Sequence, residues 1–178
     1  RTIENALMNQ IEISNDRVSM FEALKHLIVS GNVFLYLTDD GLKVYPLSKF
    51  VCKRDAMGNV LETLVKETVH PQALPPDFLE QIKKKENYDA KTMESDLDIY
   101  TYIKRMNDDV IWYQECKGEK IPNTDGRSKL DVSPWIGPLR LIKQDGEDYG
   151  RGYVEEYRGD LISLEALMQA IIEGAAAS

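Results

Sequence analysis

The sequence predicts an α+β fold, with helices near both ends of the chain and antiparallel hairpins in a mixed or antiparallel sheet between them. Two pairs of alternating polar and apolar runs are joined by short turns, which is typical of hairpins. Helical periodicity is concentrated near the termini and does not alternate with the strands, so a parallel sheet is not favoured. With 178 residues and 43% hydrophobic residues, the chain can bury a core as a single α+β region spanning 1–178.

Two helices are expected before the first strand. Apolar residues recur at helical spacing within 1–13, and again after Asn15 and Asp16, either of which can cap a second helix. We expect that helix to stop at Gly31, because glycine readily adopts the left-handed conformation after a last turn. The apolar run VFLYL (33–37) then predicts a buried central strand.

Hairpins and a short helix are expected in the middle of the chain. The predicted elements are, in order, a strand over 42–47, a hairpin over 49–67, a short helix within 74–91 and a hairpin over 97–118. The first hairpin is expected to turn at Gly58 and Asn59, which are favourable turn residues.

A strand over 139–143 and a long helix over 153–173 complete the predicted fold. Apolar residues of this helix alternate steps of four and three, a period of 3.5 residues. They are Tyr157, Leu161, Leu164, Met168 and Ile171. A second apolar stripe consists of Ile162, Leu167 and Ile172. A helix that is apolar on two faces is typically packed between elements or subunits.

The glycine-rich turn before this helix, QDGEDYGRGY (144–153), resembles a phosphate-binding loop only superficially. Glu155 stands where a dinucleotide fingerprint needs its third glycine, and the residue after Gly152 is not the lysine of a P-loop. Six carboxylates and only two arginines lie between Asp145 and Asp160. Carboxylates near a helix start gain about 0.3–1 kcal/mol each and would repel phosphate. We therefore interpret the stretch as a strand-to-helix corner.

The residues that we single out have expected structural roles at turns, corners and the start of the last helix. They are Gly31, Asn32, Gly58, Asn59, Gly146, Tyr149, Gly150, Arg151, Gly152, Glu155, Glu156, Tyr157, Asp160 and Leu161. A β-branched residue at Gly150 should harm folding or assembly if this glycine adopts a positive φ.

Cysteine, histidine and aromatic residues do not form a recognisable site in the sequence. Cys52 and Cys116 lie in predicted strands and are expected to be partly buried core residues. His26 and His70 are isolated from further metal ligands, so we assign no catalytic, cofactor or metal residue. The aromatic residues mostly alternate within strands and are not interleaved with Arg and Lys as a base-stacking platform requires. The net charge of −8 also disfavours nonspecific binding to a phosphate backbone.

Three stretches resemble the portal protein, or head-to-tail connector, family of short-tailed bacteriophages. They are LKHLIVSGNVFLYL (24–37), VYPLSKFVCKRDAMGNVLE (44–62) and LRLIKQDGEDYGRGYVEEYRGDLISLEAL (139–167), in the order of the family. The third is the most specific, because YGRGYVEEYRGDL follows an acidic glycine turn and enters a long helix. Residues 70–96 contribute nothing to the resemblance.

The resemblance implies a structural, non-enzymatic virion protein that assembles in the host cytoplasm into a ring, usually dodecameric, at one capsid vertex. Double-stranded DNA would pass through its channel during packaging and ejection without sequence-specific binding. Capsid, scaffold, terminase motor and tail proteins are the implied partners, and no cofactor is implied. The chain is similar to the wing region, with helix 153–173 leading toward the stem. Because it starts at Arg1 and not at Met, we expect a fragment of a longer chain.

Two alternatives to this structural role are considered. One is a generic α+β protein-interaction module. The other is a hydrolase that would use the paired carboxylates Asp39 and Asp40, or Asp108 and Asp109. Acid–base catalysis requires two carboxylates that face each other across a cleft, whereas these pairs lie in predicted turns, where Asp commonly bonds its own backbone.

Overall fold

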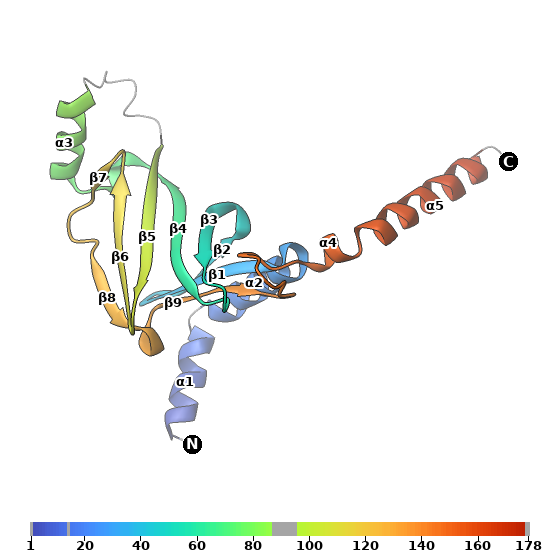
Figure 1. Cartoon of the computed structure of the whole chain (residues 1–178), viewed down its shortest axis with the longest axis horizontal. Helices are drawn as coiled ribbons and strands as arrows, with labels where there is room; N and C mark the ends of the chain where they lie inside the picture. The colour runs from blue at the N-terminus through green and yellow to red at the C-terminus, as the bar shows by residue number, and fades with distance from the viewer. Residues whose placement is uncertain (1, 14, 87–95, 177–178) are drawn as a thin grey trace. The chain divides into compact units, whose positions relative to one another are not determined.

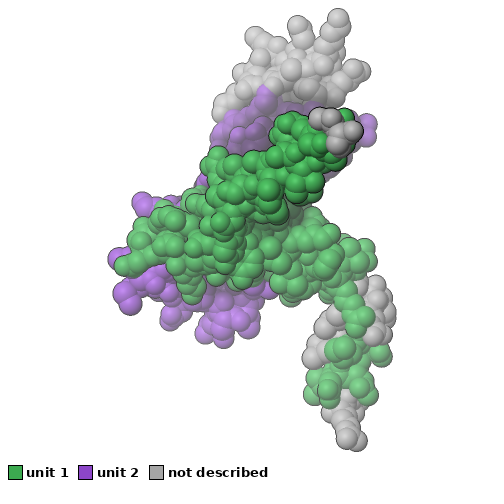
Figure 2. Space-filling view, turned by 90° about the vertical axis from the view of Figure 1, so that its right-hand side faces the viewer, with its two compact units in different colours: residues 1–47, 137–178 green, residues 48–136 purple. Residues whose placement is uncertain are grey.

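The computed structural model describes residues 2–13, 15–86 and 96–176 (Figure 1). It confirms the α+β class, with antiparallel pairing in two sheets and helices near both ends. The sequence led us to expect one region, and the fold organises the chain as two compact units. Unit 1 comprises residues 1–47 and 137–178, and unit 2 comprises residues 48–136 (Figure 2).

Unit 1 is built on a three-stranded sheet with the strand order β2-β1-β9. Its elements are α1 (Thr2–Ile13), α2 (Asp16–Ser30), β1 (Asn32–Thr38), β2 (Gly41–Pro46), α4 (Tyr153–Glu156), α5 (Arg158–Ala176) and, from Gly137 onward, β9 (Trp135–Arg140). The expected central strand is confirmed, because β1 lies between the two others and its first residues are buried. α2 packs on this sheet through Ala23 and Leu27, against Val33 and Leu35.

Two predictions about unit 1 are wrong in detail. The last strand lies at Trp135–Arg140 and not at 139–143, and it contains the buried Pro138. A proline is tolerated there because β9 is an edge strand of its sheet and has one side without ladder bonds. The expected helix over 153–173 is interrupted at Tyr157, which separates α4 from α5.

Unit 2 is built on a six-stranded sheet with the path β3-β4-β5-β6-β7, in which β8 also pairs with β6. Its strands are β3 (Phe50–Arg54), β4 (Val60–Val69), β5 (Leu97–Met106), β6 (Asp109–Cys116), β7 (Glu119–Lys120) and β8 (Gly126–Lys129). Both predicted hairpins are confirmed as antiparallel pairs, β3 with β4 and β5 with β6.

The core of unit 2 lies between α3 (Pro76–Glu86) and one end of the sheet. Phe78, with 0% of its surface exposed, packs in a cluster with Leu97, Ile99 and Cys116. Three 3-10 helices complete the described elements, at Leu47–Lys49, Pro71–Ala73 and Leu130–Val132. The helix expected within 74–91 is thus confirmed up to Glu86, and residues 87–91 lie outside the described residues.

Candidate functional site

Two segments that are far apart in the sequence meet in unit 1, and we call their contact the glycine joint. It is formed by Gly31, Asn32, Gly150, Arg151 and Gly152. The Asn32 side chain, of which 1% is exposed, bonds both backbone groups of one glycine. Its Nδ2 donates to the carbonyl oxygen of Gly150 at 2.6 Å, and the Gly150 N–H donates to Oδ1 at 2.7 Å. Because both ends of the amide are used, two buried backbone groups are satisfied by one side chain.

The glycines of the joint allow backbone to pack directly on backbone. A Cβ atom at Gly31 would lie 2.1 Å from the carbonyl carbon of Arg151, and one at Gly152 would lie 2.2 Å from the carbonyl oxygen of Val29. At Gly150 a Cβ would lie 2.7 Å from the Cβ of Arg140. All three positions are therefore too close for a side chain.

The backbone of Gly31 also has the conformation that the sequence predicted. Its φ is +74°, and its N–H donates to the carbonyl of Leu27 at 2.9 Å, which confirms it as the C-cap of α2. Gly146 has a φ of +74° as well, whereas Gly150 is not among the glycines with positive φ. We expected a β-branched residue at Gly150 to harm folding or assembly if this glycine has a positive φ, and that condition is not met. This glycine is required for close packing and not for its backbone conformation.

Hydrogen bonds connect the joint to the chain that follows β9. The Leu141 N–H donates to the carbonyl of Gly31 at 2.9 Å. Ile142 and Arg151 exchange two backbone bonds, of 3.2 Å and 2.9 Å, in an isolated antiparallel bridge. The end of α2, the segment after β9 and the start of α4 are therefore held together by backbone contacts.

Two arginines contact the acidic glycine turn, and one of them pairs with carboxylates. Arg151 Nη2 lies 3.0 Å from Glu147 Oε1, and its Nε lies 3.6 Å from Glu155 Oε1. Arg140 Nη1 donates to the carbonyl oxygen of Glu147 at 2.8 Å. These ion pairs are partly exposed, so each contributes about 0–1 kcal/mol. They orient the turn more than they stabilise it.

The other predicted structural residues lie outside the joint. Gly58 has a φ of +83° in the turn between β3 and β4, and the N–H and Nδ2 of Asn59 donate to the Asp55 carboxylate at 2.8 and 2.9 Å. This confirms the predicted turn. Of the remaining members, Glu156 donates its backbone N–H to the carbonyl of Gly152 at 3.1 Å. Tyr149 is half-buried. Exposed around α4 and α5 are Glu155, Glu156, Tyr157, Asp160 and Leu161.

Two polar residues near α2 have roles that sequence reasoning missed. Asn15 occupies the N-cap position but makes no capping hydrogen bond through its side chain. Asp16 Oδ1 instead accepts a hydrogen bond from the Leu42 N–H at 2.7 Å, which connects the start of α2 to β2. Ser30 Oγ donates to the carbonyl of His26 at 2.8 Å, beside the joint. No local signal identifies the Asp16 partner, because it lies 26 residues away.

The paired carboxylates do not form the arrangement that a hydrolase requires. Asp39, Asp40 and Asp108 are exposed residues of turns. Asp109 begins β6, and its carboxylate accepts hydrogen bonds from the Arg127 guanidinium. None of the four faces its neighbour across a buried cleft.

The cysteines and histidines lie in ordinary structural positions. Cys52 and Cys116 are buried in strands of unit 2, as predicted. His26 Nε2 lies 3.6 Å from a Glu22 carboxylate oxygen on the same helix, and His70 Nδ1 accepts a bond from the Gln72 N–H. Within residues 2–13, 15–86 and 96–176, no three potential ligands lie together as a metal site would need. Nor does this part of the chain contain a helix of the length and apolarity that membrane crossing requires.

One face of the sheet in unit 2 brings lysines beside tyrosines, which the sequence did not lead us to expect. Lys66 Nζ lies 5.9 Å from the centre of the Tyr100 ring, and Lys120 Nζ lies 5.2 Å from that of Tyr113. The rings of Tyr102 and Tyr113 are 5.4 Å apart. Cross-strand pairing creates this interleaving, because it places residues of different strands side by side.

Carboxylates pair with the lysines on this face. Lys66 lies 2.7 Å from Asp98, and Lys104 lies 2.9 Å from Glu62. The hydrogen bond from Lys66 lowers the pKa of Asp98 below its usual value, and the bond from Lys104 does the same for the pKa of Glu62. The face therefore carries mixed charge and is not a uniformly basic surface.

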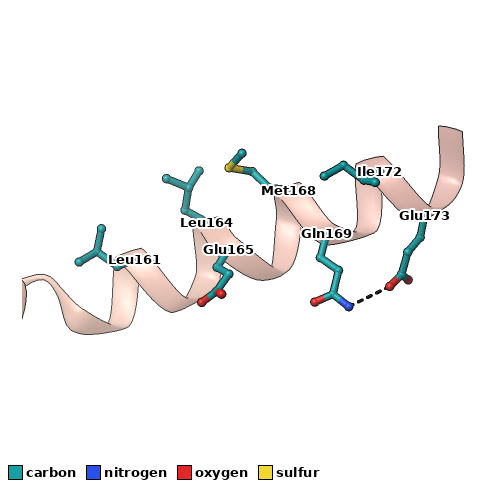
Figure 3. Close-up of a pocket in the computed structure, with 7 residues that line it drawn as sticks. All are labelled: Leu161, Leu164, Glu165, Met168, Gln169, Ile172 and Glu173. Carbon is teal, nitrogen blue, oxygen red and sulfur yellow. Dashed lines mark hydrogen bonds between the residues drawn. The ribbon is translucent and has the colours of Figure 1, made fainter. Parts of the chain in front are cut away.

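α5 presents its apolar residues to solvent. Every residue of α5 from Arg158 to Ala176 is exposed. Seven of these residues lie along one open surface of the helix, and Figure 3 shows the apolar side chains on one side of the ribbon and the polar ones on the other. The residues that line it are Leu161, Leu164, Glu165, Met168, Gln169, Ile172 and Glu173. Its apolar residues are exposed by about half, with values from 47% for Leu161 to 66% for Ile172.

Comparison with known proteins gives a consistent family assignment. The chain is 39% identical to the portal protein of Escherichia phage T7 over 179 residues and 40% identical to that of Enterobacteria phage T3 over 178 residues. Each alignment covers 96% of this chain and 33% of the relative, so the chain spans about a third of their length. The portal protein of Enterobacteria phage SP6 is 27% identical over 98% of the chain and 34% of the relative. The model of the family described as bacteriophage head to tail connecting protein matches residues 1–178. The chain therefore belongs to the bacteriophage head-to-tail connecting protein family.

Proposed function

We propose that this chain is a structural part of a phage portal, the ring that joins head and tail at one capsid vertex. The observation that carries the proposal is the match of the whole chain, residues 1–178, to the head-to-tail connecting protein family. In the proposed function the protein assembles in the host cytoplasm as a homo-oligomeric, dodecameric ring and becomes part of the virion. Capsid, scaffold, terminase motor and tail proteins are its proposed partners.

The exposed apolar surface of α5 supports oligomerisation. Monomeric proteins rarely expose a large contiguous apolar patch, and apolar residues at a period of 3.5 favour packing of one helix on another. On α5 these residues are about half exposed, including Leu161 at 47%, Leu164 at 54% and Met168 at 56%. A second copy of the protein would remove this surface from water.

The charge of the chain supports the passage of DNA without adhesion. With 30 acidic against 22 basic residues, the chain offers few sites where phosphates could displace counterions. Such a protein repels a polyanion at short range. Double-stranded DNA would thus move through a ring during packaging and ejection without being bound in a sequence-specific manner.

The glycine joint supports the proposed assembly by fixing the start of the last helical segment. Gly152 lies against the backbone of Val29 and Gly31, directly before α4. In a ring of identical subunits, the interface helix must begin at the same position relative to the rest of its subunit in every copy. We propose that the joint provides this common starting point.

Electron microscopy and light scattering of the full-length protein test this function. Wild-type protein should form rings, and Leu164→Glu should shift the population to smaller species, because a buried unpaired charge costs several kcal/mol. Gln169→Glu, which adds the same charge on the polar side of α5, is the matched control and should still form rings. Monomers of the wild type under assembly conditions, or rings of undiminished yield from Leu164→Glu, would contradict the proposal.

A further inference from the structure

We propose that Tyr157 to Gly159 form a hinge, about which α5 changes direction while α4 stays attached to the glycine joint. This inference concerns the chain itself and does not depend on the proposed ring.

The backbone leaves the helical conformation at one residue. Tyr157 has a φ of −105° and a ψ of 20°, whereas an α-helix has values near −63° and −42°. Regular bonds continue on both sides, from the Tyr157 N–H to the carbonyl of Tyr153 at 2.9 Å and from the Leu161 N–H to the carbonyl of Tyr157 at 3.0 Å. The interruption is thus confined to the turn that contains Tyr157, as expected of a hinge, where few residues absorb the change in dihedral angles.

The local sequence favours two short helices over one continuous helix at this point. Gly159 would lie inside a continuous helix, where glycine is less favourable than alanine by about 0.5–1 kcal/mol. Glu156 and Asp160 would be like charges four residues apart, which destabilises a helix by a few tenths of a kcal/mol. Asp160 instead lies in the first turn of α5, where the helix dipole favours a carboxylate.

The two sides of the interruption are attached to the fold very differently. On the α4 side, Gly152 packs on the backbone of Val29, and Arg151 lies within ion-pair distance of Glu155. On the α5 side, every residue up to Ala176 is exposed, so within the described part of the chain no buried side chain of α5 has to be displaced when α5 turns. Moving α5 therefore costs little free energy, whereas moving α4 would break its contacts with the glycine joint. This difference places the pivot between α4 and α5.

Distances between spin labels on the unassembled, full-length protein test the hinge. One pair, Lys25→Cys with Gln169→Cys, spans it, and a second pair, Lys25→Cys with Lys143→Cys, stays on the α4 side. The buried native cysteines are kept, and protein without an introduced cysteine gives the background. Dilution with unlabelled protein removes distances between copies. The distribution of distances for the label pair that spans the hinge should be about twice as broad as the distribution for the reference pair.

Substitutions of two glycines in α5 locate the pivot. Gly159→Ala should narrow the distribution across the hinge, because alanine favours the continuous helix, and its Cβ would meet nothing within 4 Å, so folding is not disturbed. Gly174→Ala, which is equally unobstructed but lies beyond the labelled positions, should leave the distribution unchanged. The proposal is overturned if the wild-type distribution is as narrow as the reference, or if Gly159→Ala has no more effect than Gly174→Ala.

Discussion

A methyl group at Gly152 is the most direct perturbation of the glycine joint. The added Cβ would lie 2.2 Å from the carbonyl oxygen of Val29 and 2.6 Å from the nitrogen of Gly31. Ordinary contacts of a Cβ atom lie at 3.4–4 Å, so the end of α2 would have to move away by about 1 Å. The obstructing atoms belong to the backbone and cannot rotate away as a flexible side chain would.

The expected loss of stability follows from this geometry. Inserting a methyl group into a close-packed site costs about 1–3 kcal/mol, and a site walled by backbone should lie near 3 kcal/mol. Movement of α2 would also stretch the bonds between Asn32 and Gly150, which are 2.6 and 2.7 Å long. For a protein of this size, about 3 kcal/mol lowers Tm by roughly 6–12 °C.

Thermal and urea unfolding of Gly152→Ala and wild type measure this effect. Gly174→Ala is the matched control, because its Cβ would meet nothing within 4 Å and alanine favours a helix by about 0.5–1 kcal/mol. We expect the control to be as stable as wild type or slightly more stable. The reasoning is refuted if Gly152→Ala is as stable as Gly174→Ala, since the backbone contact at Gly152 would then not be tight.

Three further predictions concern other parts of the fold. Asn32→Ala should lower the unfolding free energy by about 2–4 kcal/mol in urea titrations, because both backbone groups of Gly150 lose their partner; unchanged stability would mean that water replaces the amide. Gly58→Ala should lower the free energy of unfolding by about 1 kcal/mol, because Gly58 has a φ of +83°. Gly58→Asn should lower it less, since Asn tolerates this conformation. Equal losses in the two variants would argue against a backbone cause. The hydrogen bond from Lys66 lowers the pKa of Asp98 in the folded state. The stability that this ion pair contributes is therefore complete above the unfolded-state pKa of roughly 4, and it is lost as pH falls through the folded-state pKa. Unfolding of wild type and Asp98→Asn between about pH 5 and pH 2 should therefore show a smaller acid-induced loss in the variant; parallel curves would exclude this ion pair as a contributor.

Features that depend on local chemistry could be predicted from the sequence. The C-cap at Gly31 and the hairpin turn at Gly58 follow from the backbone freedom of glycine beside periodic residues. The central strand 33–37 follows from its apolar run. The interruption at Tyr157 was missed because the apolar period of 3.5 continues through it, and a side-chain pattern does not report backbone dihedrals.

Features that depend on contacts between distant segments could not be predicted. The sequence marked Gly31, Asn32 and Gly150 as structural residues but did not indicate that they touch each other. Asn15 or Asp16 was expected to cap α2, and Asp16 accepts a hydrogen bond from the backbone of β2. The lysines beside Tyr100 and Tyr113 come from neighbouring strands or turns, so a search for interleaving along the chain does not find them.

The sequence by itself determined the α+β class, the hairpins, the glycine corner and the family, because each depends on residue types and spacings within a short stretch. Only the tertiary structure decided why the glycines are needed. A Cβ at Gly152 would meet the backbone of Val29 and Gly31, and one at Gly150 would meet the Cβ of Arg140 and the carbonyl oxygens of Gly31 and Ile142. Asn32 is buried because it satisfies the polar backbone groups of Gly150. Steric exclusion and hydrogen-bond satisfaction act between neighbours in space, and the order of residues along a single chain does not record which neighbours those are.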